Sequence, residues 1–186
     1  LFCVFDLIFT KNGLVTDNDS TSLNGETTVS DGEVKIDGVT ALEGNSNAGE
    51  FLGKYVTAYI YFGKDENKVI YVEANDRYTD EIIISADDIE NVNTTSRKIE
   101  YILGNKTKTV DYSPVVKVIK NGKYFADYQK SDLMIKNGSL RLIDNDKDKK
   151  YDVIFIENYS YVIADGVLPS KNLIQNAYAE PASFDF

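Results

Sequence analysis

Four aspartates in one short segment are the residues of this chain whose types and spacing point most directly to chemistry. Asp144, Asp146, Asp148 and Asp152 stand at relative positions 1, 3, 5 and 9, and the backbone carbonyl of Lys150 falls at position 7. Oxygen atoms at such intervals can surround one hard cation, and calcium takes about six to eight of them at about 2.3–2.6 Å. The segment therefore predicts a loop that calcium, rather than magnesium, would hold in place without any catalytic role.

The same loop departs from an EF-hand at two positions. Lys149 occupies position 6, where an EF-hand has glycine, and Phe155 occupies position 12, where an EF-hand has a bidentate glutamate. Three lysines within the loop also offset its negative charge. A solvated turn between two strands accounts for these residues as well as a calcium loop does, and both interpretations stay open.

Most catalytic and metal sites are excluded by composition. The chain has no histidine, which removes Ser-His-Asp and Cys-His catalysis and every histidine-ligated zinc site. Cys3 is the single cysteine, so an internal disulfide and multi-cysteine metal sites are excluded as well. Because Cys3 lies in an apolar alternation, we expect it to be a small buried hydrophobic residue and not a nucleophile.

Paired carboxylates are the one catalytic device that the composition leaves available. Glycoside hydrolysis needs only two acids at the right separation, and three places could supply them: Asp76, Asp80 with Glu81, and Asp87 with Asp88. Thirty acidic residues supply many such pairs by chance. We therefore expect no enzyme and assign no catalytic residue.

Thirteen tyrosines are the most conspicuous apolar feature, and most fall in expected strands. Cross-strand packing is the ordinary use of tyrosine in a sheet. The alternative is a face on which carbohydrate stacks, and Tyr59 and Tyr61, two positions apart on one strand, are its candidates.

The charge balance indicates which partners the chain does not have. Thirty acidic and 20 basic residues give a net charge of −10, which repels a phosphate backbone, so we expect no nucleic-acid partner. No stretch approaches the roughly 20 apolar residues of a membrane helix, so we expect no membrane insertion.

Short strands separated by tight turns recur along the whole chain and predict an all-β fold, with short antiparallel strands in small barrels or sandwiches and little helix. Only residues 170–179 could form a helix of ordinary length, and a tail is an equal alternative. The clearest expected strands are 2–10, which we expect to end at a turn over 11–13, the hairpin 55–62 and 68–73, and the pair 139–143 and 151–157 around the acidic loop.

A polar loop over residues 43–50 is the best internal boundary. The expected organisation has three parts. These are an N-terminal β-hairpin region over residues 1–45, a β-rich module with the acidic loop over residues 50–165, and a C-terminal tail over residues 166–186.

The residues from Asp132 to Asp146, followed by 150–156 and 161–163, resemble a β-rich module of Firmicutes surface (S-layer-type) proteins and phage virion structural proteins that carries a DNDxD loop. The segments 52–61, 69–72, 86–89 and 118–123 are similar to other parts of that module, so the resemblance covers roughly residues 50–165. It implies a surface or virion part without catalysis. Lys149 departs from the loop glycine that is usual in the module, which weakens the metal assignment.

From these observations we expect a non-enzymatic structural module of a large extracellular or virion assembly, such as a phage tail, collar or adsorption component, with no required cofactor. A bacterial S-layer or wall-anchored surface domain and a carbohydrate-binding module are the alternatives. The expected partners are copies of the chain or neighbouring structural subunits at a virion or cell surface. We expect them to meet the loops at 17–32 and 43–50, and residues 2–9 to add a strand to a neighbour's sheet.

Overall fold

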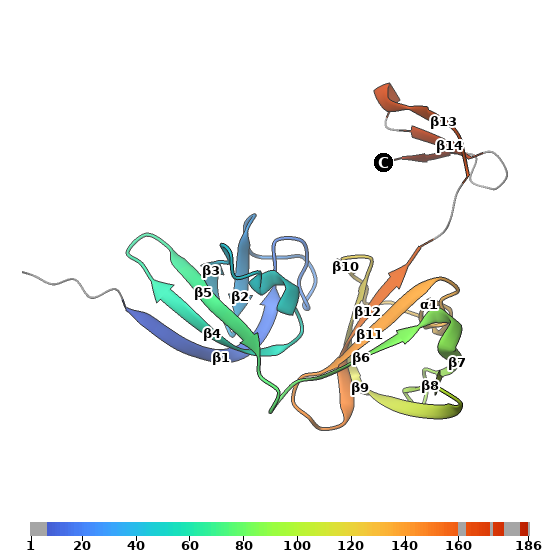
Figure 1. The fold of residues 1–186 in the computed structure, drawn as a ribbon, viewed down its shortest axis with the longest axis horizontal. Helices are drawn as coiled ribbons and strands as arrows, with labels where there is room; N and C mark the ends of the chain where they lie inside the picture. Colours follow the sequence, from blue (N-terminus) through green and yellow to red (C-terminus); the bar gives the residue numbers. More distant parts are fainter. Residues whose placement is uncertain (1–6, 160–162, 172, 177–182, 186) are drawn as a thin grey trace, which may run out of the picture.

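The computed structural model describes residues 7–159, 163–171, 173–176 and 183–185, and these residues form three separate β-sheets (Figure 1). The described α-helix is one turn, α1 (Lys130–Leu133), accompanied by the 3-10 turns η1 (Ala48–Phe51), η2 (Ala86–Asp88) and η3 (Pro169–Lys171). The predicted all-β class with little helix is therefore confirmed. No helix in the described ranges is long and apolar enough to cross a bilayer.

The first sheet is a closed barrel with the strand order β1-β2-β3-β5-β4. Its strands are β1 (Ile8–Asp17), β2 (Glu33–Ile36), β3 (Val39–Leu42), β4 (Tyr55–Phe62) and β5 (Asn67–Ala74). Alternate side chains point inward, and the small residues Ala41 and Ala58 lie among larger ones such as Val34, Ile36 and Ile60, all at most 1% exposed. Such a mixture of sizes fills the narrow interior of a small barrel.

The predicted turn at residues 11–13 is wrong, because β1 runs straight through it. Ile8 to Leu14 pair in unbroken antiparallel register with Tyr61 to Tyr55 of β4. The glycine that looked like a turn residue has a packing function. A Cβ atom on Gly13 would collide with the side chain of Asp37 at the β2–β3 turn, so only glycine allows this close approach.

The loop over residues 18–32, between β1 and β2, is organised around the buried carboxylate of Asp17. Thr16 donates its hydroxyl to Oδ2 at 2.6 Å, and the hydroxyl of Thr28 donates to Oδ1 at 3.3 Å. Burial by itself raises the pKa of Asp17, but hydrogen bonds from Thr16, Ser22 and Thr28 and the positive charge of Lys35 outweigh burial, so the pKa lies below its usual value. The charged form of Asp17 therefore stabilises the folded loop.

Asp17→Asn is expected to lower the free energy of unfolding by about 2 kcal/mol at pH 7, because hydrogen bonds to a charged group contribute about 1.5–3 kcal/mol. The folded pKa lies below the ordinary value of 3.8. The wild-type advantage is thus complete above pH 3.8 and disappears as the pH falls through the folded pKa. Urea unfolding of both proteins between pH 7 and pH 2.5 measures the difference, and a difference independent of pH would contradict this assignment.

The second sheet has seven strands, ordered β6-β11-β12-β9-β8-β7, with β10 added to β9. The strands are β6 (Asp80–Ser85), β7 (Ile89–Asn93), β8 (Lys98–Leu103), β9 (Lys106–Lys120), β10 (Lys123–Tyr124), β11 (Gly138–Asp144) and β12 (Lys150–Asn158). The central pair β12 and β9 is parallel, whereas the other pairs are antiparallel. The predicted pair 139–143 and 151–157 is confirmed.

Both faces of β11 and β12 are covered, which explains their nearly continuous apolar sequence. Ile143, Val153 and Phe155 face the barrel and share its hydrophobic core. Leu140, Leu142, Ile154 and Ile156 face the other way, into a second core that β7, β8 and α1 close. The barrel and the second sheet are thus joined by one continuous hydrophobic contact.

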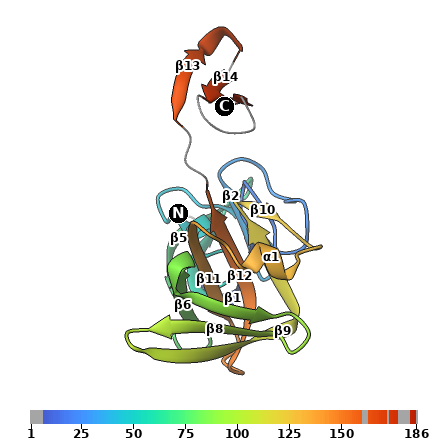
Figure 2. The same ribbon diagram turned by 90° about the vertical axis from the view of Figure 1, so that its right-hand side faces the viewer.

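The third sheet consists of β13 (Ala164–Leu168), β14 (Leu173–Asn176) and β15 (Ser183–Asp185). Figures 1 and 2 both show it standing apart from the other two sheets. The described part of the predicted segment 170–179 holds the end of the 3-10 turn η3, at Lys171, and the strand β14, so no helix of ordinary length lies there. The rest of that segment lies outside the described residues.

The sheets do not divide the chain at the predicted boundary. Strands β4 and β5 bond to β1 and β3, so the barrel takes strands from both sides of the loop at 43–50. The change from barrel to second sheet falls between Ala74 and Asp80, and β13, β14 and β15 form a sheet where a tail was expected. Pairing between distant strands decides these boundaries, and local composition does not record it.

Candidate functional site

The acidic loop connects β11 to β12 and gathers three of its four aspartates. One carboxylate oxygen from each of Asp144, Asp146 and Asp152 lies within 4.8 Å of the other two. Asp144 ends β11 and Asp152 lies in β12, and these strands are adjacent, so the sheet itself brings two of the carboxylates together. Asp144 and Asp152 thus meet because their strands pair in a hairpin, and not because of their spacing along one continuous loop.

Asp144 is the structural centre of the loop. Its side chain is buried, and three backbone N–H groups donate to it: Asp146 and Lys147 to Oδ1 at 3.2 and 2.6 Å, and Lys149 to Oδ2 at 2.9 Å. A carboxylate offers about four acceptor positions, so Oδ2 retains one position for a cation. Asp144 therefore shapes the turn whether or not an ion is bound.

Asp146 and Asp152 each keep one carboxylate oxygen without a described protein donor. Asp146 Oδ1 accepts the N–H of Asp148 at 3.0 Å, and Asp152 Oδ2 accepts the N–H of Asn145 at 3.1 Å. Burial raises the pKa of Asp152, the Asn145 bond opposes the rise, and the negative charges of nearby aspartates add to it. A bound cation would relieve this accumulation of charge.

Asp148 lies outside this group of carboxylates, and Lys150 belongs to a strand of the sheet. Asp148 is exposed, and both of its carboxylate oxygens accept hydrogen bonds from Lys150. The backbone N–H of Lys150 donates to Oδ1 at 2.7 Å and its ammonium group donates to Oδ2 at 3.2 Å. Lys150 is also the first residue of β12 and is paired with Asp111 of β9. Its backbone therefore belongs to the sheet.

Two lysines in the loop adopt a conformation that favours glycine. Lys147 has φ 61° and Lys149 has φ 71°. The second is the position at which an EF-hand has its glycine, so the backbone follows the expected turn although the residue differs. The backbone bonds to Asp144 hold both lysines in this conformation, which costs about 1–2 kcal/mol for a residue other than glycine.

The acidic loop also connects the two large sheets. Asn145 donates its side-chain amide to the carbonyl of Gly53 in the barrel at 3.1 Å. Close by, Glu81 accepts from Lys54 of the barrel at 2.6 Å and from Arg141 of β11 at 3.4 Å, and the Arg141 guanidinium stacks on Phe155 at 3.9 Å from the ring centre. An ion in the loop would therefore act on the barrel–sheet junction.

The remaining predicted candidates are not part of the loop triad, although Asp80 of β6 is the register partner of Asp144 in β11. Of the acids considered for hydrolysis, Glu81 is committed to the two ion pairs above, and Asp76, Asp80 and Asp87 are exposed. Tyr59 and Tyr61 lie on the outward face of β4, where the Tyr59 ring is 6.0 Å from that of Tyr71 on β5. Cys3 lies outside the described residues.

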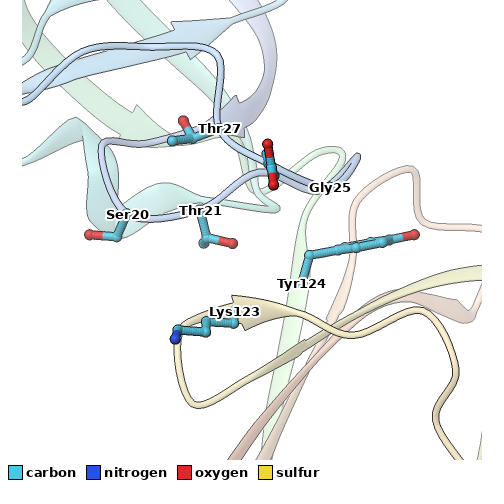
Figure 3. A pocket seen from close by; sticks show the side chains of 7 residues that line it. Ser20, Thr21, Gly25, Thr27, Lys123 and Tyr124 are labelled. Carbon is cyan, nitrogen blue, oxygen red and sulfur yellow. The ribbon is translucent and has the colours of Figure 1, made fainter.

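A groove between the barrel and the second sheet is the feature that the sequence analysis missed. It has a volume of about 550 Å³ and is lined by Ser20, Thr21, Gly25, Glu26, Thr27, Lys123 and Tyr124. Figure 3 shows its two walls, the loop after β1 and the strand β10. These segments are about a hundred residues apart and share no local motif, so no sequence signal marked them as one site.

Comparisons of the chain with protein-family models, with curated proteins and with solved structures found no match.

Proposed function

We propose that this chain is a non-enzymatic structural module of a large extracellular or virion assembly, such as a phage tail, collar or adsorption component. The observation that carries the proposal is the free edge of β1 before Val15, where β2 does not pair with it. The segment from Leu7 to Leu14, together with β4 and β5, forms a ribbon that extends away from the second sheet (Figure 1); we call it the β1 ribbon.

Large apolar side chains are exposed on the β1 ribbon. Leu7, Ile8 and Phe9 are each at least 50% exposed, and so are Ile70 and Tyr71 on β5. Phe9 contacts Phe62 edge to face at 5.6 Å, so two of the aromatic side chains of the ribbon lie together. Exposed apolar surface of this kind at a sheet edge is typical of an interaction surface.

The backbone of β1 provides hydrogen-bonding groups at the same edge. Leu7 accepts from Phe62 of β4, and Leu14 accepts from Asp37 on the opposite side. Because bonding direction alternates along a strand, the N–H and C=O groups of Ile8, Thr10 and Asn12 point away from β4. No strand covers this edge within the described residues. A neighbouring subunit could therefore add a strand here, as in β-augmentation.

The net charge of −10 supports the same proposal, because it keeps an exposed module soluble and reduces nonspecific attachment to anionic surfaces. A bacterial S-layer or wall-anchored surface domain would use the same edge and remains the alternative. Residues 2–6 of the expected pairing strand lie outside the described residues, so the proposal rests on residues from Leu7 onward.

Thr10→Pro is expected to weaken assembly at least tenfold, as measured by sedimentation velocity over a range of protein concentrations. Proline removes an N–H that points away from β4, so the barrel keeps its own ladder while the edge loses a donor. Thr10→Ala, which keeps the N–H, is the matched control and should assemble like the wild type. Equal association of all three proteins would contradict edge pairing.

Immunogold electron microscopy of the source cells and the particles they release tests the broader function. Label on tailed particles would support a virion component, and label on a wall lattice would support the surface-layer alternative. Label confined to the cell interior would overturn both.

We also propose that the acidic loop binds calcium and thereby stiffens the barrel–sheet junction. Three carboxylates within 4.8 Å and the Asn145–Gly53 bond support this role. Calcium at 100 times its dissociation constant is expected to stabilise the protein by about 2.7 kcal/mol. Asp146→Ala should abolish this increase, because it removes one of the three carboxylates. Since Asp146 is exposed, its loss should leave the turn around Asp144 in place. An unchanged melting temperature with calcium and with EGTA would show a plain turn.

A further inference from the structure

We propose that the groove between the loop at 18–32 and β10 binds a neutral saccharide. The groove volume of about 550 Å³ lies within the range of about 300–1,000 Å³ that is typical of small-ligand sites. This inference goes beyond the structural role proposed above, because no residue of the β1 ribbon lines the groove.

The barrel wall of the groove is held in shape before any ligand arrives. Asn18 Oδ1 accepts the backbone N–H groups of Ser20 and Thr21 at 3.1 and 2.9 Å, and its amide donates to the carbonyl of Gly49 at 3.2 Å. Thr27 donates its hydroxyl to the carbonyl of Asn18 at 2.6 Å. One asparagine thus fixes three of the positions that line the groove, which reduces the ordering cost of binding.

The opposite wall is equally constrained. Asn121 and Gly122 form the tight turn before β10 with φ 48° and 77°. The Asn121 amide donates to the carbonyl of Asn158 at 2.9 Å, and Asn121 Oδ1 accepts the N–H of Asn158 at 2.9 Å. This pair of bonds fastens the hairpin to β12, so Lys123 and Tyr124 are presented from a rigid support.

The hydroxyl group of Thr21 is the feature of the groove that points to a ligand. Its side chain lines the groove although the residue is only 6% exposed, and its hydroxyl has no hydrogen-bond partner within the described part of the chain. The hydroxyl oxygen itself is open to the groove, because it is not among the fully buried polar atoms without a partner in the described residues. A ligand hydroxyl in the groove would satisfy it, and Figure 3 shows Thr21 directed into the space beside Tyr124.

The other lining groups fit a polyhydroxylated ligand. Tyr124 packs against the barrel core and also lines the groove, so its ring can receive the apolar C–H face of a sugar. Glu26 and Lys123 make no ion pair with any described residue, which leaves an acceptor on one wall and a donor on the other.

The charges also select against charged ligands. An anion would meet Glu26 and the net charge of −10, and a cation, although that net charge attracts it, would meet the ammonium group of Lys123 in the groove. A neutral molecule with many hydroxyl groups can use both side chains as hydrogen-bonding partners without this repulsion. Among small ligands, saccharides combine this polarity with an apolar ring face.

The test is an NMR titration of the isotopically labelled chain with four neutral tetrasaccharides: maltotetraose, cellotetraose, xylotetraose and chitotetraose, each at up to several millimolar. We expect at least one to shift the amide signals of Thr21, Glu26 and Tyr124. Tyr124→Ala should weaken that binding at least tenfold, and Glu26→Gln, at an exposed position, should weaken it several-fold.

Tyr59→Ala is the matched control, since it removes an exposed tyrosine from the outward face of β4 and should leave the affinity unchanged. Glu26→Gln keeps the test decisive if Tyr124→Ala does not fold. No shift with any of the four sugars, or shifts that follow Tyr59 and Tyr61, would overturn the assignment. Failure of this site would leave edge pairing by Thr10 untouched, because that is measured by sedimentation without a sugar.

Discussion

Gly138→Ala is expected to lower the free energy of unfolding by about 4 kcal/mol. Gly138 has φ 101°, which side chains rarely adopt, and a Cβ atom there would collide with the backbone carbonyl of Glu157 on β12. Backbone strain of this kind costs about 1–3 kcal/mol, and forcing extra atoms into a packed site costs about 1–3 kcal/mol more. Because the clash is with backbone, a change of rotamer cannot relieve it.

Gly25→Ala separates the two contributions. Gly25 has φ 125°, but nothing lies within 4 Å of the position that its Cβ would occupy. The control should therefore lose only the strain, about 1–3 kcal/mol. Urea unfolding can be followed by tyrosine fluorescence, since the chain has no tryptophan. Equal losses in the two variants would show that the Glu157 carbonyl moves away freely.

Asp144→Ala is expected to cost about 3 kcal/mol even without calcium. Three backbone N–H groups donate to this buried carboxylate, and leaving a buried donor unpaired costs about 1–3 kcal/mol. Lys147 and Lys149 would also lose the bonds that hold them at positive φ. The expected result is an unfolded or rearranged loop and a weaker barrel–sheet junction, measured as a lower free energy of unfolding in EGTA.

Two further variants test whether the backbone bonds to Asp144 are what stabilises the loop. Asp148→Ala removes an exposed side chain that serves only Lys150, so its cost should stay below about 1 kcal/mol. Asp144→Asn keeps one oxygen and should fall between the two alanine variants. If Asp144→Ala in EGTA were as stable as the wild type, the backbone bonds would not be what shapes the loop.

Asp144 and Asp146 are expected to differ in whether the effect of their loss depends on calcium. Loss of Asp144 should destabilise the protein with or without calcium, whereas loss of Asp146 should remove only the calcium-dependent gain. A single melting experiment on both variants, with calcium and with EGTA, therefore separates the folding role of the loop from its proposed metal role.

Local patterns in the sequence determined the strand content and several turns of this protein. The alternation of aromatic and β-branched residues correctly predicts β4 and β5, and the dipeptide Asn121-Gly122, of a type that favours tight turns, does form one before β10. These succeed because turn and strand preferences depend on neighbouring residues. The acidic loop was found for the same reason, since its residues lie within one short segment.

Tertiary structure decided the features that depend on contacts between distant segments. Asn12-Gly13 looks like a turn, yet β4 pairs along the whole of β1 and the glycine makes room for Asp37. Only Asp144, Asp146 and Asp152 converge, because strand pairing selects among the aspartates. Thr21 and Tyr124 became neighbours only when the barrel packed on the second sheet. Burial and strand pairing between segments far apart in the chain formed the groove. Neither can be predicted from a short stretch of sequence, because both depend on residues that are distant in the chain.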